Sequence, residues 1–359
     1  TGTLVFTAPN WVDGMAKLVV IFTTYLLYEL AYNLFNIPYG SLLAAMAKND
    51  EERAKLSSAR GIGGIMGNLI PMTLFPIVIS TFEKTPQLGY GMGVTVCAVI
   101  GFIGCFLSYK FTEERCTQTS KKQPEDAKIT DIFDVFAKNR AFLALAIHGV
   151  CQGLTMAISQ TMGTYMFSDV LGNLALMSVS TILTMPLSIL VLLFSPKLVK
   201  KMGSINLICK TTMIGAGLYV ILFVLHIMTN VNAWTHIILS ALAGSFISIG
   251  TMMQWGLVGE TIDDNEYLLG KRTEGTIYGT FNMLRRLGQA IGSATGVALL
   301  GWIGYDVALS NAGMAQSAGT VFGIKVLCVL VPAIVSLGSW GAFRFVWNID
   351  KKVTNDSAI

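Results

Sequence analysis

Apolar stretches of about 20 residues follow one another along nearly the whole chain, and short polar segments separate them. About nine of these stretches are long enough to cross a bilayer, and they lie at residues 16–43, 62–82, 90–109, 141–167, 174–194, 205–225, 235–258, 276–302 and 321–347. Residues 4–8 are apolar but too short to span, and we expect them to be the tail of a helix that begins upstream. Backbone groups in lipid must be hydrogen-bonded internally, so such runs predict an all-α integral membrane protein.

Composition agrees with this pattern, because 53% of the 359 residues are hydrophobic and only 13% are charged, whereas soluble domains carry about 25% charged residues. The net charge of +4 does not indicate nucleic-acid binding, since the basic residues gather between the spans. They concentrate in every second polar segment, which predicts a multi-pass plasma-membrane protein with a cytoplasmic C-terminus. Cysteine and histidine spacings indicate neither a disulfide nor a metal site, and we expect no cofactor.

The longest polar segment, residues 110–140, is rich in Lys, Asp and Gln and is predicted to link two halves. Spans before and after it predict the major facilitator fold, two six-helix bundles with the first bundle truncated, in which substrate binds near the midplane between the halves. We expect residues 1–109 to hold the rest of the N-terminal bundle, from the end of its third helix through its sixth. Residues 110–140 would be the cytoplasmic linker, 141–350 the C-terminal six-helix bundle and 351–359 a cytoplasmic tail. We expect a monomer in the lipid bilayer.

Polar side chains form a stripe in the first complete span. Tyr25, Glu29, Tyr32 and Asn36 follow at spacings of four, three and four and therefore share one helix face, with Asn33 beside them. Hydroxyls and amides suit a polyhydroxylated ligand, because each can donate and accept hydrogen bonds. The alternative is that the amides hold helices together. An intramembrane carboxylate indicates function by default, so Glu29 is our candidate for a protonatable or cation-coupled group.

A second stripe follows Gly275. Its members are Tyr278, Asn282, Arg286 and Gln289, at spacings of four, four and three. Arg286 would lie roughly 16 Å along this helix, about halfway through a hydrocarbon layer of about 30 Å. A guanidinium at that depth needs a water-filled cavity or a partner, and the alternative to a substrate role is a structural pair, with Glu29 as the candidate. The sequence offers no partner for Arg285.

Small residues lie on the opposite face of this helix. Gly288, Gly292 and Gly296 recur at every fourth position and permit close helix packing. A helix with one polar face and one small-residue face is expected to line a cavity. Gln160 and Gln254 are further candidates for the wall of that cavity.

Two charged segments adjoin the predicted cytoplasmic ends of spans. One is the predicted loop at residues 48–60, and the other runs from Glu260 to Glu274 and separates two spans. We expect the mixed charges of the second segment to form ion pairs that hold a cytoplasmic gate shut in one state, with residues 50–60 as a matching cluster and with individually weak pairs so that the gate can reopen. The alternative is an ordinary solvated loop. The gate candidates are Glu260, Asp263, Glu266 and Arg272.

Several segments together resemble one known family. The sequence NIPYGSLL at Asn36–Leu43, followed by ERAKLSSAR at Glu52–Arg60, resembles the fourth-helix signature of the glycoside–pentoside–hexuronide:cation symporters. The segment Glu260–Gly275, continued by Tyr278–Gly292, resembles the family's region from the tenth to the eleventh helix, and Leu300–Tyr305 resembles the turn that follows. The resemblance covers the chain from the end of the third helix to the C-terminus.

The resemblance implies a secondary transporter that takes up a sugar or glycoside together with a cation. Judged against melibiose permease, a member of that family, it implies that Tyr32, Asn36 and Arg60 belong to a sugar site. It further implies that Arg286 lies between the sugar and cation sites, with Asn282 on the same helix face. Asp263, Glu266 and Arg272 match the family's cytoplasmic gate.

Two departures change what the resemblance implies. An amide stands at Asn36 where melibiose permease has Asp, which removes any indication of galactoside specificity. Arg286 stands in place of a Lys and cannot titrate near neutral pH. The family's cation-site carboxylates belong to its second helix, which is absent here, so Na⁺ and H⁺ both stay open as coupling ions.

We therefore predict a sugar or glycoside symporter that works by alternating access. The alternative within the same fold is a transporter of a non-sugar solute such as a lysolipid or drug. An enzyme is not expected, because the spans contain no HExxH, GxSxG or paired aspartates. A purely structural membrane protein would leave Glu29 and Arg286 at mid-depth unexplained.

Overall fold

The computed structural model describes residues 14–46, 50–81, 86–112, 129–173, 175–229, 231–269, 274–311 and 314–349. Most of these residues are helical, and none of them forms a strand. Apart from residues 82, 174 and 347 at their ends, the nine predicted spans lie within long helices of the described chain, so the all-α membrane fold is confirmed.

The chain divides into a short N-terminal group of helices and a larger C-terminal group. The first group consists of α2 (Met15–Met46), α3 (Asp50–Thr81) and α4 (Pro86–Phe111), and the short α5 (Ile129–Lys138) follows it. The second group begins with α6 (Arg140–Tyr165), which the π-helical turn Met166–Val170 extends, and continues with α7 (Ala175–Met202), α8 (Ser204–Met228), α9 (Ala233–Leu269), α10 (Glu274–Trp302) and the short α11 (Val307–Asn311). Its last helix has four parts, which are α12 (Ala318–Lys325), the π-helical turn Val326–Leu330, α13 (Val331–Gly341) and the π-helical turn Ala342–Val346.

The predicted loop at residues 48–60 is wrong, and a helix also extends into the charged segment that follows Glu260. The segment predicted as a loop at residues 48–60 forms the first turns of α3 from Asp50 onward. Glu51 and Lys55 pair at 3.0 Å one turn apart there, and Ala, Leu, Lys and Glu are good helix formers. The charged segment after Glu260 likewise continues α9 as far as Leu269. The charged residues of these two segments therefore do not mark the ends of their helices.

The predicted linker also contains a helix that the sequence reading missed. Residues 129–138 form α5, whose apolar positions share one face. Phe136 on α5 meets Phe142 of α6 edge to face, with ring centroids 5.0 Å apart. Asn139 then caps α6 by accepting a hydrogen bond of 2.8 Å from the backbone N–H of Phe142. The end of the linker is thereby packed against the C-terminal helices.

Seven described helices are long and apolar enough to cross a membrane by length and composition. Neither α3 nor α10 is among them, although both run beside helices that are. These two helices are less apolar, because α3 begins with a charged segment and α10 carries two arginines and several glycines. Both of these helices also carry arginines of the polar cluster described below, Arg60 on α3 and Arg285 and Arg286 on α10.

Glycines bring α10 unusually close to α6. A Cβ added at Gly288 would lie 2.4 Å from the backbone oxygen of Val150, and one added at Gly153 would lie 2.2 Å from that of Arg285. Gly292 is equally confined, because an added Cβ would approach the Cβ of Ala157 at 2.9 Å. The predicted packing role of the small-residue face is confirmed, and this contact fixes which way the opposite face of α10 points.

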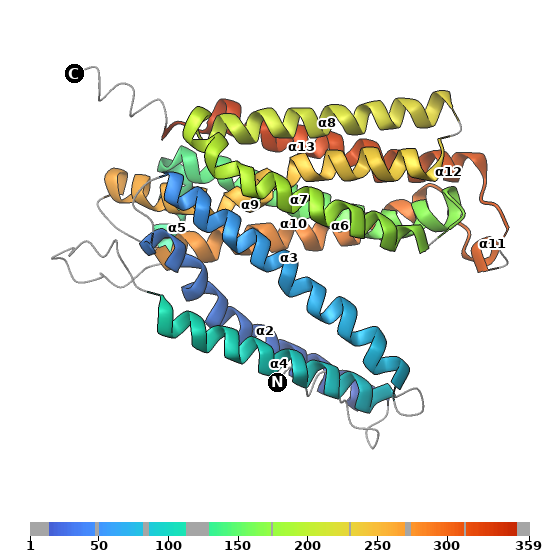
Figure 1. Cartoon of the computed structure of the whole chain (residues 1–359), viewed down its shortest axis with the longest axis horizontal. Helices are drawn as coiled ribbons and strands as arrows, with labels where there is room; N and C mark the ends of the chain where they lie inside the picture. Colours follow the sequence, from blue (N-terminus) through green and yellow to red (C-terminus); the bar gives the residue numbers. More distant parts are fainter. Residues whose placement is uncertain are drawn as a thin grey trace.

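Among the described residues, α2 and α3 contact the C-terminal group over the half of their length that lies nearest α5. In Figure 1, α2 and α3 approach the other helices near α5, and their axes diverge toward the opposite end of the molecule. Gly40, near the end of α2, lies so close to Tyr278 that an added Cβ would meet its ring at 1.7 Å. Farther along α3, Gly63, Gly64 and Gly67 have no described neighbour within 4 Å of an added Cβ.

Candidate functional site

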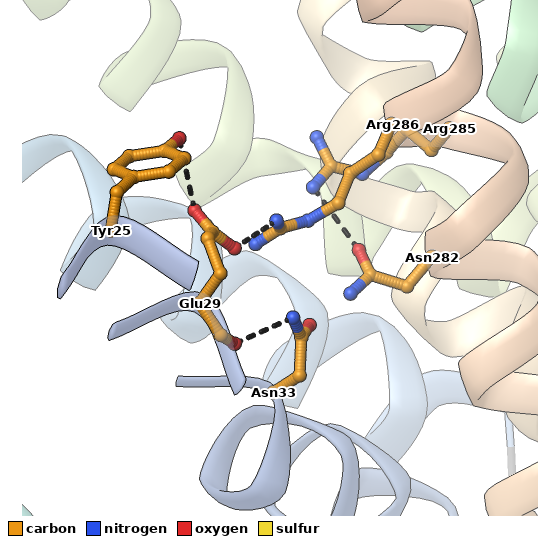
Figure 2. A network of polar contacts seen from close by, with 6 residues as sticks. All are labelled: Tyr25, Glu29, Asn33, Asn282, Arg285 and Arg286. Atoms are coloured by element: carbon orange, nitrogen blue, oxygen red, sulfur yellow. Dashed lines mark hydrogen bonds and ion pairs between the residues drawn. The ribbon is translucent and has the colours of Figure 1, made fainter. Parts of the chain in front are cut away.

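The centre of the site is an ion pair between the two groups of helices. Nη1 of Arg286 on α10 donates to Oε2 of Glu29 on α2 at 2.6 Å. Figure 2 shows the two side chains reaching toward each other from their separate helices. Their side chains are 35% and 27% exposed, so the pair is partly shielded from solvent. The structure thus contains the pairing that the sequence left as the alternative for Arg286.

Neighbours on α2 hold Glu29 in place. The hydroxyl of Tyr25 donates to Oε1 of Glu29 at 3.3 Å, and the side-chain amide of Asn33 donates to the backbone oxygen of Glu29 at 2.8 Å (Figure 2). The guanidinium carbon of Arg286 lies 5.2 Å from the ring centroid of Tyr32, a cation–π distance. The predicted stripe on α2 therefore gathers around the ion pair.

Arg285 has partners that the sequence did not reveal. Its Nη2 donates to Oδ1 of Asn282 at 3.2 Å, and its guanidinium carbon lies 5.8 Å from the ring of Trp255. Its Nε is buried and has no acceptor among the described residues. Such an orphaned buried donor is uncommon and needs an explanation, for which a bound ligand or water is a usual answer.

Arg60 of α3 enters a cage of aromatic rings from three other helices. Its guanidinium carbon lies 4.2 Å from the ring centroid of Trp255 on α9, 5.5 Å from Tyr39 on α2 and 5.9 Å from Tyr278 on α10. Its Nη2 also donates to the Tyr278 hydroxyl at 3.0 Å. Arg60 thereby joins both groups of helices close to the Glu29–Arg286 pair, since Tyr278, Asn282 and Arg286 follow one another along α10.

The site carries more positive than negative charge. Arg60, Arg285 and Arg286 bring three guanidinium groups together around the rings of Trp255 and Tyr32. In the described part of the chain, Glu29 is the carboxylate that contacts one of them. Like charges this close in a weakly polar setting repel each other, so the cluster favours an additional anion.

The remaining predicted site residues differ in burial. Asn36 is half-buried on α2, one turn beyond Asn33. Gln254, beside Trp255, is fully buried, and its Oε1 has no described hydrogen-bond donor. Gln160 is exposed on α6, one turn beyond Met156, whose sulfur accepts from Gln289 at 3.3 Å. The structure therefore buries Gln254 and leaves Gln160 exposed, and neither residue contacts the arginines in the described hydrogen bonds.

The charged segments meet where the helix groups touch. Arg53, at the start of α3, forms an ion pair with Asp263 of α9, and the Arg53 side chain is only 10% exposed. Deeper in the same contact, the hydroxyls of Ser58 on α3 and Ser195 on α7 lie 2.7 Å apart. Glu260 and Glu266 are half-buried on the same stretch of α9. Arg272, the fourth predicted gate residue, lies outside the described residues.

A second link joins α3 to α7 at this end. Oε2 of Glu51 lies 3.1 Å from Nζ of Lys200, and its other oxygen lies 3.0 Å from Lys55. Hydrogen bonds from these two lysines hold the pKa of Glu51 below its usual value of 4.5. The link is therefore charged at neutral pH, and its contribution is lost only as pH falls through that depressed pKa.

Sequence reading missed Arg53, Tyr39 and Trp255 as site residues. Arg53 stood in the expected charged cluster, but spacing within one segment cannot name a partner 210 residues away. Trp255 follows Gln254 directly, and aromatic residues in an apolar run give no periodic signal of their own. The contacts of these residues join helices that are far apart in sequence, so only the folded structure shows them.

Comparison with known proteins identifies the family of this chain. The model of the family described as MFS/sugar transport protein matches residues 1–351. The chain belongs to this family, whose members are transporters of the major facilitator type. The family that the sequence motifs resembled is consistent with this assignment.

Individual relatives are consistent with this family assignment. An uncharacterized symporter of Bacillus subtilis, YjmB, is 32% identical over 92% of this chain and 70% of its own length. A glucuronide carrier protein homologue of Escherichia coli is 27% identical over 96% of this chain and 73% of its own length. The crystal structure of the E. coli fucose:proton symporter superposes with a TM-score of 0.63 at 12% identity, covering 96% of this chain and 80% of that one, which supports the fold.

Proposed function

We propose that this member of the MFS/sugar transport family takes up a sugar or glycoside across the plasma membrane by symport with Na⁺ or H⁺, through alternating access. The observation that carries the proposal is the Glu29–Arg286 ion pair, which joins α2 to α10 amid polar side chains. An ion pair between separate helix groups, partway along membrane helices, is costly unless it serves a site. Midway between the bundles is also where transporters of this type bind substrate.

In this proposal the sugar hydroxyls bind to the polar groups around the pair. Tyr32, Asn33 and Asn36 would act from α2, and Asn282 and Gln254 from α10 and α9. The buried Oε1 of Gln254 has no described donor and would accept a hydrogen bond from a sugar hydroxyl. Arg60 and Arg286 would donate to sugar oxygens. Gln160 would contribute only to the edge of the site.

The charge of the cluster supports a narrower substrate class. Three guanidinium groups with one contacting carboxylate favour a ligand that bears an anionic group, and the unpartnered Nε of Arg285 offers a donor for it. A sugar acid or its glycoside meets both requirements, with hydroxyls for the amides and a carboxylate for the arginines. The name of the glucuronide carrier homologue fits this chemistry, since a glucuronide bears a carboxylate.

Glu29 is the proposed coupling group. Arg286 stays charged at any physiological pH, so a proton or cation can alter the pair only through the carboxylate. Protonation of Glu29, or Na⁺ at its oxygens, would release Arg286 toward the substrate. The pair would then be one of two arrangements that alternate during the cycle.

Contacts between Arg53 and Asp263 and between Glu51 and Lys200 are the proposed closed gate, on the cytoplasmic side. Glu260, Glu266 and Arg272 would complete it. The divergence of the helix axes toward the other end supports a state that faces outward (Figure 1). Residues 110–140 would form the cytoplasmic linker between the bundles, the protein would act as a monomer, and the C-terminus would also be cytoplasmic.

Uptake by proteoliposomes tests the proposed function directly. The panel would pair labelled neutral glycosides with the corresponding glucuronides, each measured with and without an imposed Na⁺ or H⁺ gradient. We expect gradient-driven accumulation of at least one sugar, with the glucuronide taken up in preference to its neutral counterpart. Equilibration without accumulation would refute symport, and no sugar uptake under any gradient would favour a lysolipid or drug as the solute.

The substitution Arg285→Gln tests the anionic substrate class. Losing a charge-assisted hydrogen bond costs about 1.5–3 kcal/mol, so we expect KM for the glucuronide to rise roughly tenfold or more. KM for the neutral glycoside in the same preparation should change less than about twofold, which makes that substrate the internal control. Equal effects on both substrates would show that Arg285 does not recognise the anion.

The substitution Asp263→Asn tests the gate. Because Asp263 is half-exposed, its pair with Arg53 is expected to contribute about 1 kcal/mol, and its loss should raise the population of the open gate up to about fivefold. A cysteine placed at Ser58 in a Cys-free background should then react faster with a thiol reagent. Lys197→Gln, which removes a charge from an exposed position of α7 outside the proposed gate pairs, is the control. Unchanged labelling in Asp263→Asn would contradict the gate.

A further inference from the structure

A groove on the far side of the C-terminal helices lies outside the transport site. It is open, has a volume of about 640 Å³, and runs between α8 and the end of the last helix. Its lining includes Lys210 and Met213 from α8, and Trp340, Phe343, Arg344 and Trp347 from the last helix. Neither α2 nor α3 contributes to it, and nothing in the proposed transport cycle uses it.

The position of the groove along the helices matches a membrane interface. Lys210 lies about 9 Å from Ser204, where α8 begins, and Arg344 belongs to the last turn of the final helix. Figure 1 shows these two helix ends side by side next to the C-terminus. Lysine and arginine at such a depth extend their charged groups to the headgroup layer, where tryptophan is also enriched.

The polar groups of the groove all favour an anion. The side chains of Lys210 and Arg344 are exposed, and no acidic residue appears in the described lining. Trp347 is 4% exposed, and its indole N–H has no acceptor among the described residues. Two exposed cations thus line the groove, and an anionic group would compensate both of them; the indole N–H of Trp347 lies just beneath the lining and has no acceptor among the described residues.

Apart from Asn206, the rest of the lining is apolar. Met213 is 45% exposed and Ile214 is 48% exposed beside it, and Trp340 adds aromatic surface. A soluble anion would leave this surface uncovered, whereas a hydrocarbon chain would cover it. Basic pockets between membrane helices on the cytoplasmic side suit lipid phosphates for the same reason.

We propose that this groove binds one anionic phospholipid. Its phosphate contacts Lys210 and Arg344 and reaches the indole N–H of Trp347, and an acyl chain lies along Met213, Ile214 and Trp340. The bound lipid would join α8 to the last helix, both of which belong to the C-terminal group. This inference does not rest on the proposed transport function.

Native mass spectrometry of the purified protein, titrated with dioleoylphosphatidylglycerol or dioleoylphosphatidylcholine, tests the inference. We expect one phosphatidylglycerol to be retained at least about tenfold more tightly than phosphatidylcholine, because both lipids carry the phosphate but the choline of phosphatidylcholine brings a positive charge toward Lys210 and Arg344. Lys210→Gln with Arg344→Gln should abolish this preference. Lys197→Gln with Lys201→Gln removes the same charge from exposed positions at the end of α7, outside the groove, and should retain it.

Two further measurements separate the remaining explanations. Trp347→Phe keeps the ring and both cations but removes the N–H, and it should weaken phosphatidylglycerol binding several-fold while the protein stays monodisperse. Inorganic phosphate at millimolar concentration should not displace the lipid. Equal retention of both lipids, retention of the preference in the Lys210/Arg344 variant, or displacement by phosphate would each overturn the proposal.

Discussion

The ion pair between Glu29 and Arg286 is the contact on which the candidate site depends. An arginine partway along a membrane helix needs compensation, and here a carboxylate from another helix group supplies it at 2.6 Å. The same contact holds α2 against α10 at the point where the two groups of helices would otherwise separate. Breaking it leaves an uncompensated charge in a partly shielded site. The pair therefore holds the two groups of helices together, and a change in its charge would weaken that contact.

The geometry of that pair is prepared by packing elsewhere. Gly153 and Gly288 let α6 and α10 approach until backbone touches backbone, which fixes the rotation of α10. Arg285 and Arg286 then face the cluster from adjacent positions, toward Trp255 and Tyr32 respectively. A small-residue face on one side of a helix thus determines where the charged face on the other side points. Arg60, held among aromatic rings, ties α3 to the same place.

Much of the fold could be predicted from the sequence, because lipid imposes long apolar helices and leaves a plain pattern. The stripe containing Glu29 and the glycine face of α10 were likewise readable from helical spacing. The helical starts of α3 and the helical end of α9 were not, since charged residues form helices as readily as they form loops. The partners of Arg53 and Arg285 were beyond reach, because contacts between distant segments have no periodic signature within either one.

The most direct test of the central claim exchanges the two charges, in Glu29→Arg combined with Arg286→Glu. If the pair couples the two groups of helices, each single substitution should abolish gradient-driven sugar accumulation, and the double variant should recover a measurable part of it. Recovery requires the two positions to act through each other, which a merely local role would not produce. Full accumulation in either single variant, or a double variant whose residual transport is only the product of the two single effects, would contradict the account.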